Sequence, residues 1–232
     1  MLKEKVKSWQ HIFKLDPAKN ISKKDLDKIK QSNTDALIVG GTDNIEAEDV
    51  IDLLLALSDT SLPIILEISS MEAIVPGFDY YFIPVVLNSQ DKKWMMDIHH
   101  EAIKEYKEYL DFAEFLVEGY CIFNEDAKVY QKTNCTKPTI EDALAYAYIA
   151  ENFFNLTSFY IEYSGQYGDV DLVKQVSEEL NETLLFYGGG ITTLEQAKEM
   201  KQYADVIIVG NVIYEDIEQA IETTKVKKWV LE

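Results

Sequence analysis

Lys14 and Asp16 are two charged residues that stand two positions apart at the end of an apolar segment, His11–Leu15. Side chains alternate along a strand, so two residues spaced in this way point to the same side. Charges at the end of a buried strand are costly unless they bind something, and a lysine beside a carboxylate suits a phosphate or a metal-bound phosphate. A surface lysine followed by a helix-capping aspartate is the structural alternative.

A second group of reactive side chains lies in residues 159–165, which read Phe-Tyr-Ile-Glu-Tyr-Ser-Gly. Tyr160, Glu162 and Ser164 alternate onto one side of the expected strand. A carboxylate between two hydroxyl groups can hydrogen-bond to a substrate hydroxyl or accept its proton. The alternative is a buried Glu162 that pairs with Lys14 across the interior of the fold.

Two apolar segments near the end of the chain finish in glycine. Residues 184–187 run into the glycines 188–190, and residues 206–209 run into Gly210 and Asn211. Glycine permits a sharp turn and leaves backbone N–H groups accessible, which is what a phosphate requires beside a helix N-terminus. The pattern predicts a phosphate site, with a purely structural turn as the alternative.

The elements that must position these residues alternate along the chain. Helical patterns separate most of the apolar segments, and Ser22, with Asp25 three residues later, is the expected N-cap of the first helix. A chain of 232 residues with 47% hydrophobic content suits one (β/α)8 barrel spanning residues 1–232, with its site at the C-terminal ends of the strands. Strands are expected near residues 11–15, 36–39, 64–68, 80–87, 115–124, 159–165, 184–187 and 206–209.

The connection between the third and fourth strands departs from this pattern. Residues 69–79 are few, largely apolar, and interrupted by Pro76 and Gly77. Parallel neighbours normally need a crossover of a dozen or more residues that contains a helix. We therefore predict a modified barrel without a regular third helix, whose gap exposes an apolar strip for a partner or an apolar ligand. A long helix over residues 92–111 is expected beside this strip.

The loop after the second strand, with Gly40, Gly41 and Thr42, is expected on the same face as Asp16. Hydroxyl and carboxylate oxygens suit Mg²⁺, which takes one or two protein oxygens and leaves its other positions to water and phosphate. The alternative is that Thr42 or Asp43 caps the following helix.

Charge and composition exclude several classes of function. A formal net charge of −19 argues against nucleic acid as a partner and against electrostatic adhesion to an anionic membrane. The sequence lacks a signal-peptide pattern and any apolar run of membrane-spanning length, and Cys121 and Cys135 lack zinc or redox spacing. A soluble, cytoplasmic protein is expected, in which local features hold any anionic substrate.

Five motifs in order carry a resemblance: Lys-Leu-Asp-Pro at 14–17, Gly-Gly-Thr at 40–42, residues 160–165, Tyr-Gly-Gly-Gly-Ile at 187–191, and Val-Gly-Asn at 209–211. Together they resemble the geranylgeranylglyceryl phosphate synthase superfamily over essentially the whole chain. With Glu-Gly-Tyr at 118–120, the chain more closely resembles the bacterial PcrB branch, the heptaprenylglyceryl phosphate synthases. Three glycines stand at 188–190, where Ser-Gly-Gly is common in relatives. This difference keeps the backbone groups that would bind a phosphate and removes at most one hydroxyl.

The resemblance implies a modified TIM barrel and an Mg²⁺-dependent prenyltransferase. This enzyme would transfer a long polyprenyl group, expected to be heptaprenyl, from polyprenyl diphosphate to the 3-hydroxyl of sn-glycerol 1-phosphate. It would be a homodimer with at most transient membrane contact. Glu162 would orient or deprotonate the hydroxyl, and Asp16 and Thr42 would bind the metal. The residues implied in binding glycerol 1-phosphate are Lys14, Tyr160, Ile161, Glu162, Tyr163, Ser164, Gly165, Gly190, Gly210 and Asn211.

Two other classes of protein remain open from the residues alone. A barrel that isomerises or cleaves a sugar phosphate would share the terminal glycine motifs, although the middle strands supply no lysine suited to a Schiff base. A non-catalytic barrel would share the apolar gap but gives no reason for Lys14, Asp16 and Glu162 to converge.

We expect the donor's tail to leave the barrel at residues 69–79, because the interior of such a barrel is filled by side chains.

Overall fold

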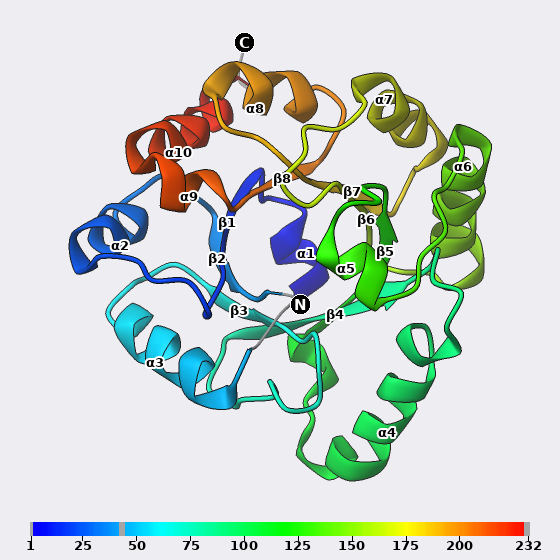
Figure 1. The fold of residues 1–232 in the computed structure, drawn as a ribbon, viewed down its shortest axis with the longest axis horizontal. Coiled ribbons are helices and arrows are strands. Elements are labelled where there is room, and N and C mark those ends of the chain that lie inside the picture. Colours follow the sequence, from blue (N-terminus) through cyan, green and yellow to red (C-terminus); the bar gives the residue numbers. More distant parts are fainter. Residues whose placement is uncertain (1, 42–44, 230–232) are drawn as a thin grey trace.

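Eight parallel strands close into a barrel in which each strand pairs with the next along the chain and β8 returns to β1 (Figure 1). The structure, a computed structural model, describes residues 2–41 and 45–229. The strands are β1 His11–Leu15, β2 Ala36–Val39, β3 Ile64–Glu67, β4 Tyr80–Val86, β5 Phe115–Ile122, β6 Ser158–Glu162, β7 Leu184–Gly188 and β8 Val206–Val209. The barrel confirms the α/β class and the eight expected strands.

Most of the helices surround this barrel on its outer side (Figure 1). The α-helices are α1 Leu2–Val6, α2 Lys23–Lys30, α3 Ala47–Leu57, α4 Asp97–Tyr106, α5 Lys128–Lys132, α6 Ile140–Tyr148, α7 Val170–Glu179, α8 Leu194–Lys201, α9 Val212–Glu215 and α10 Ile217–Thr223. A π-helical turn, η4 Ile149–Phe153, extends α6, and 3-10 turns lie at η1 Lys92–Trp94, η2 Lys107–Tyr109, η3 Phe112–Glu114 and η5 Thr224–Trp229. Ser22 caps α2 as expected, accepting a hydrogen bond from the Asp25 backbone N–H at 3.1 Å.

Alternation along the strands divides the buried side chains into two clusters. One cluster fills the barrel interior and includes Ile38, Phe82 and Phe186. The short helix α1 contributes Leu2 and Val6 to this inner cluster, so it covers one end of the barrel. The interior is therefore packed, and a ligand must bind at the open end or on the outside.

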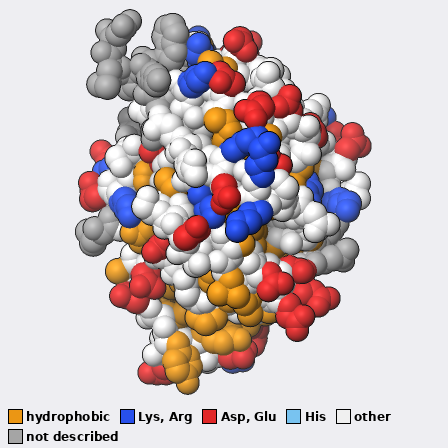
Figure 2. Space-filling model, turned by 90° about the vertical axis from the view of Figure 1, so that its left-hand side faces the viewer, with side chains coloured by type: hydrophobic (Ala, Val, Ile, Leu, Met, Phe, Trp, Pro, Cys, Tyr) orange, Lys and Arg blue, Asp and Glu red, His pale blue; other side chains and the backbone are white. Residues whose placement is uncertain are grey.

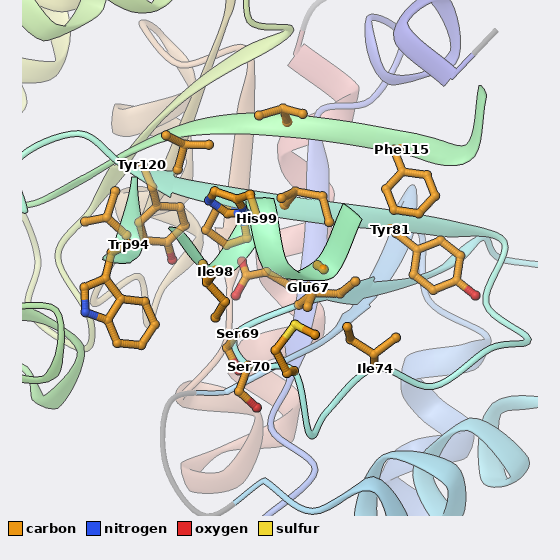
Figure 3. A pocket seen from close by; sticks show the side chains of 18 of the residues that line it. Glu67, Ser69, Ser70, Ile74, Tyr81, Trp94, Ile98, His99, Phe115 and Tyr120 are labelled. Atoms are coloured by element: carbon orange, nitrogen blue, oxygen red, sulfur yellow. The ribbon is translucent and has the colours of Figure 1, made fainter. Parts of the chain in front are cut away.

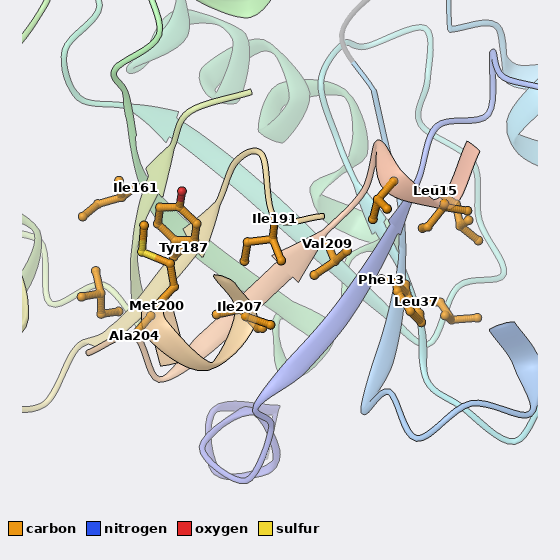
Figure 4. Packing of buried hydrophobic residues seen from close by; sticks show 14 of the residues in the cluster. Phe13, Leu15, Leu37, Ile161, Tyr187, Ile191, Met200, Ala204, Ile207 and Val209 are labelled. Atoms are coloured by element: carbon orange, nitrogen blue, oxygen red, sulfur yellow. The ribbon is translucent and has the colours of Figure 1, made fainter. Parts of the chain in front are cut away.

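The other cluster lies between the strands and the helices. Tyr187 on β7, Met200 on α8 and Ile207 on β8 belong to it (Figure 4). Tyr187 and Ile207 are register partners on adjacent strands, and Met200 is completely buried. This packing holds β7, β8 and the glycine loops that follow them against the helical layer.

The connection from β3 to β4 lacks the helix that other crossovers have. Residues 68–79, all of them described, form turns and bends only, and β4 follows β3 directly in the element order. The prediction of one long helix over residues 92–111 was wrong. The Asp91 side chain caps the short turn η1, and the non-helical backbone of Met96 separates that turn from α4.

In the described ranges, no helix has the length and apolar character needed to cross a bilayer.

Replacing Met200 by alanine should lower the free energy of unfolding by about 2–5 kcal/mol, because it removes a fully buried side chain and leaves a cavity. Equilibrium unfolding in urea measures this loss. Met96→Ala is the matched control, since Met96 is 57% exposed and its truncation should change stability by about 0.5 kcal/mol or less. Equal losses in both variants would contradict the packing described here.

Candidate functional site

An ion pair lies at the C-terminal end of the barrel interior. Lys14 on β1 and Glu67, the last residue of β3, approach to 2.5 Å between Nζ and Oε2. Burial alone would lower the pKa of Lys14, but the negative charges of Glu67 and Glu162 outweigh it and raise that pKa above its usual value. The ammonium therefore keeps its charge. The alternative in which Lys14 pairs with Glu162 is wrong, because Glu67 takes that place.

Sequence reasoning missed Glu67 as a site residue. The available signal was the one used for Lys14 and Glu162, namely a charged side chain at the C-terminal end of an apolar strand. Glu67 is only 5% exposed, and its Oε1 has no hydrogen-bond partner within the described ranges. Oε1 is therefore a buried acceptor without a donor in the part of the chain that the structure describes.

Glu162, the last residue of β6, is held by two donors. The Tyr120 hydroxyl donates to Oε2 at 2.8 Å, and the Ser164 backbone N–H donates to Oε1. Burial raises the pKa of Tyr120 and of Tyr160 well above the usual value, and the charge of Glu162 adds to the effect. Both phenols therefore stay protonated, and two donors hold the Glu162 carboxylate in a fixed orientation at the C-terminal end of the barrel, here called the mouth. The sequence indicates Tyr120 only as part of the Glu-Gly-Tyr motif at 118–120.

The loops after β6, β7 and β8 meet because glycine allows close approach. A Cβ on Gly190, whose φ is +57°, would lie 2.1 Å from the backbone nitrogen of Tyr167. A Cβ on Gly165, whose φ is +82°, would lie 2.8 Å from the Asn211 side chain. Gly210 lies beside Lys14, with the Lys14 carbonyl oxygen 3.5 Å from its ideal Cβ position. The structure thus brings these predicted residues into one region around the ion pair.

Two residues predicted in this region point away from it. Ile161 belongs to the cluster between strands and helices. The ring of Tyr163 stacks on Phe123 with 5.2 Å between centroids, while its backbone N–H donates to the Gly188 carbonyl. Neither side chain therefore serves a ligand at this end of the barrel, and the Tyr163 N–H is already engaged, whereas Tyr160 and Glu162 alternate onto the interior face.

Lys19 is a second cation beside the glycine loops that the sequence did not single out. Its Nζ donates to Asn211 Oδ1 at 3.1 Å and lies 4.9 Å from the centroid of the Tyr214 ring. The Tyr214 hydroxyl in turn accepts a hydrogen bond from the Asp16 backbone N–H at 2.8 Å. Lys14 and Lys19 together supply local positive charge in a strongly acidic protein.

Asp16 lies where a metal-bound phosphate could approach. Its Oδ1 accepts a bond from the Ala18 backbone N–H, and its carboxylate lies so close to Gly41 that a Cβ there would be 2.7 Å from it. Thr42, the other predicted metal residue, lies outside the described residues. Among those described, no group of three or more His, Cys, Asp or Glu side chains could hold a metal ion. One carboxylate fits Mg²⁺, which takes few protein ligands when a phosphate completes its shell.

An apolar groove of about 1060 Å³ begins at this mouth. Lys14, Glu67 and Glu162 line its polar end, and the outer face of β4, residues 68–79 and α4 line the rest. Figure 3 shows Glu67 in the middle of this wall and the rings of Tyr81 and Phe115 farther along it. These two rings stack with 5.2 Å between centroids.

His99 of α4 also lines the groove. Burial lowers its pKa, and a bond to the Trp94 backbone only partly opposes this effect. A neutral imidazole therefore adds no charge to the apolar wall.

Near the groove the surface is apolar as well. Figure 2 shows hydrophobic side chains gathered at the lower end of the view, the end at which α3 and α4 lie in Figure 1.

A sequence model described as the PcrB family matches residues 4–228. The chain belongs to the PcrB family. The heptaprenylglyceryl phosphate synthase of Oceanobacillus iheyensis is 58% identical to it, over 96% of this chain and 98% of that protein. The protein of the same name from Lysinibacillus sphaericus is 54% identical, over 95% and 96% of the two chains.

A solved structure shares the fold of this PcrB family member. It is the crystal structure of (S)-3-O-geranylgeranylglyceryl phosphate synthase from Thermoplasma acidophilum in complex with its substrate sn-glycerol-1-phosphate. The two chains are 24% identical with a TM-score of 0.81, and the match covers 96% of each. At this identity the likeness establishes the barrel fold alone.

Replacing Glu67 by glutamine should lower the pKa of Lys14, because it removes the partner whose charge does most to raise that pKa. An NMR titration that follows the Lys14 Nζ and Cε signals measures the change. Glu218→Gln is the control, since it removes the partner that Lys28 contacts at 2.6 Å on the surface. A Lys14 titration unaltered by Glu67→Gln would show that the ion pair does not control its charge.

Proposed function

We propose that this PcrB family protein is a heptaprenylglyceryl phosphate synthase, which transfers a heptaprenyl group from its diphosphate to the 3-hydroxyl of sn-glycerol 1-phosphate. The observation that carries the proposal is the joining of two environments. A polar mouth with Lys14, Glu162 and glycine loops opens directly into an apolar groove. The names of the two bacterial relatives support the same reaction.

The phosphate of glycerol 1-phosphate would bind among Lys14, the Ser164 hydroxyl, the backbone of Gly165 and Gly190, and the Gly210-Asn211 turn. Backbone N–H groups at glycine turns and one ammonium can hold a phosphate even in a protein with a net charge of −19. Holding the phosphate in this way leaves the glycerol hydroxyls directed at Glu162 and Tyr160. Fixed position raises the effective concentration of the attacking hydroxyl.

Glu162 would act on the attacking 3-hydroxyl. The bond between the allylic carbon and the diphosphate oxygen breaks, and its electron pair leaves with the diphosphate. The glycerol oxygen forms the new C–O bond, and its proton passes to Glu162. Tyr120 and the Ser164 N–H hold the carboxylate in a fixed orientation for this transfer. An allylic cation needs only a weak nucleophile, so removal of the proton can be late.

Mg²⁺ would be held by Asp16 and Thr42 together with the diphosphate. When bound, the ion neutralises negative charge on the leaving group, an effect worth several kcal/mol in such reactions. The Asp16 carboxylate beside Gly41 supports this assignment, because it offers an oxygen ligand at the same mouth.

The prenyl tail would run along the groove formed where the β3–β4 crossover lacks a helix. We propose that the absence of a helix in this crossover creates the space for the donor's tail. Burial of each methylene contributes about 0.8 kcal/mol, so a long groove favours a long donor. The rings of Phe78, Tyr81 and Phe115 provide apolar walls for such a tail.

The protein would act as a homodimer in the cytoplasm. Large exposed rings at the end of α6, in η4 and directly after it supply an apolar surface that two copies could share, namely those of Tyr148, Phe153 and Phe154. The two cysteines are free and buried, which suits a reducing compartment.

An extraction assay tests the reaction. The protein is incubated with radiolabelled glycerol 1-phosphate, Mg²⁺ and heptaprenyl diphosphate, and label should pass into butanol. A chelator that removes the metal should abolish the transfer. Label that stays in water under all conditions would refute prenyl transfer, and conversion of a sugar phosphate instead would favour an isomerase or aldolase.

Glu162→Gln should lower kcat by about 10²-fold or more while glycerol 1-phosphate still binds, because glutamine keeps the size of the side chain but cannot accept the proton. Steady-state rates and equilibrium binding measure the two effects separately. Glu199→Gln is the matched control, since Glu199 also accepts a bond from a tyrosine hydroxyl, that of Tyr167, but lies away from the groove. An unchanged kcat in Glu162→Gln would remove Glu162 from the chemistry.

Ala102→Trp should reduce kcat/KM for heptaprenyl diphosphate by about tenfold or more and affect farnesyl diphosphate least, because the ring would displace methylenes worth about 0.8 kcal/mol each. Ala102 lines the groove from α4. Ala113→Trp is the control, since Ala113 is exposed and does not line the groove. Equal losses for short and long donors would place the tail elsewhere.

A further inference from the structure

Glu118 is a buried carboxyl group for which the reaction above has no use. It lies on β5 two residues before Tyr120, so both side chains face the barrel interior. The residue is completely buried, and neither carboxyl oxygen has a hydrogen-bond partner in the part of the chain that the structure describes. Ser158, its register partner on β6, is also completely buried and has an unpartnered hydroxyl there.

The charged groups around Glu118 do not compensate a negative charge on it. Glu67 from β3 and Glu162 from β6 repel such a charge, and Lys14 from β1, which attracts it, is already paired with Glu67. The remaining titratable neighbours are the phenols of Tyr120 and Tyr160. Burial raises the pKa of Glu118 well above its usual range, and the charge of Glu67 adds to this effect.

We propose that Glu118 is a positioning residue of this site, a neutral carboxylic acid beneath the mouth whose ionisation would disturb the lysine that holds the phosphate. A buried carboxylate with no partner is very costly, whereas a neutral acid can donate a hydrogen bond, and Ser158, its register partner, has a hydroxyl that can accept one. Adjacent strands lie about 4.8 Å apart, which puts the two side chains within reach.

The charge state of Glu118 decides the net charge below the mouth. With Glu118 neutral, Lys14 cancels Glu67, and the charge of Glu162 alone remains to accept a proton. Ionised Glu118 would add a second uncompensated charge, which repels a phosphate and attracts the Lys14 ammonium away from it. The proposal rests on the assignment of Lys14 to the phosphate. It predicts that the KM for glycerol 1-phosphate rises with pH while kcat at saturation changes much less.

Infrared spectroscopy tests the protonation without any turnover. At a pH where exposed carboxyl groups are ionised, the protein should show the C=O stretch of a protonated carboxylic acid, and the band should shift in deuterium oxide. The band should disappear in Glu118→Gln and persist in Ser158→Ala. If the wild-type protein lacks this band, the proposal is overturned, whatever the protein catalyses.

Kinetics test the positioning role. The ratio of the wild-type KM for glycerol 1-phosphate to the KM of Glu118→Gln should increase several-fold as the pH is raised from neutral to alkaline, because only the wild type gains the extra charge. Titration of the substrate phosphate occurs with both proteins and cancels in the ratio. Ser158→Ala keeps the carboxyl group and should retain the wild-type rise. A ratio that stays constant with pH overturns the positioning role.

Discussion

The ion pair between Lys14 and Glu67 is the constraint on which the rest of the mouth depends. The Lys14 ammonium group faces three carboxyl groups, those of Glu67, Glu118 and Glu162, inside a barrel whose described interior is largely apolar. Attraction in a medium of low polarity is strong, and so is the penalty for any charge left alone. The position of each acid relative to Lys14 therefore determines its role. Glu67 pairs with the lysine, Glu162 is held in place by a hydrogen bond from Tyr120, and Glu118 is best accommodated without charge.

The fold separates two kinds of ligand chemistry on one rim. On the side of β6, β7 and β8, close glycine turns bring backbone groups together, and a side chain at Gly190 would collide with the neighbouring loop. On the side of β4, a crossover without a helix leaves the outer face of the sheet available to an apolar chain. The end of the barrel that carries the glycine turns is therefore also the end at which the apolar groove begins. Glu162 and Glu67 line the groove at this end.

A protein with a net charge of −19 can still act on anions because the relevant charges are local. Lys14 and Lys19 lie beside the glycine turns, while much of the acidic excess is on the surface, where salt screens it over about 8–10 Å. Membership of the PcrB family, shown over nearly the whole chain, favours prenyl transfer over the sugar-phosphate reactions that the glycine motifs alone left open.

The sequence by itself determined the barrel, because the spacing of eight apolar strands and their glycine ends reflects local periodicity and backbone freedom. It also predicted Lys14, Glu162 and Gly190 as site residues, since each lies at or just after the C-terminal end of such a strand. Only the tertiary structure decided which acid pairs with Lys14, because Glu67 and Lys14 are 53 residues apart and their contact depends on the closure of the barrel. The same is true of the break before α4, where η1 turns the chain, and of the isolation of Glu118. Whether a buried carboxyl group has a partner depends on residues from other strands, which are distant in the sequence, so its charge state cannot be predicted from the residues next to it.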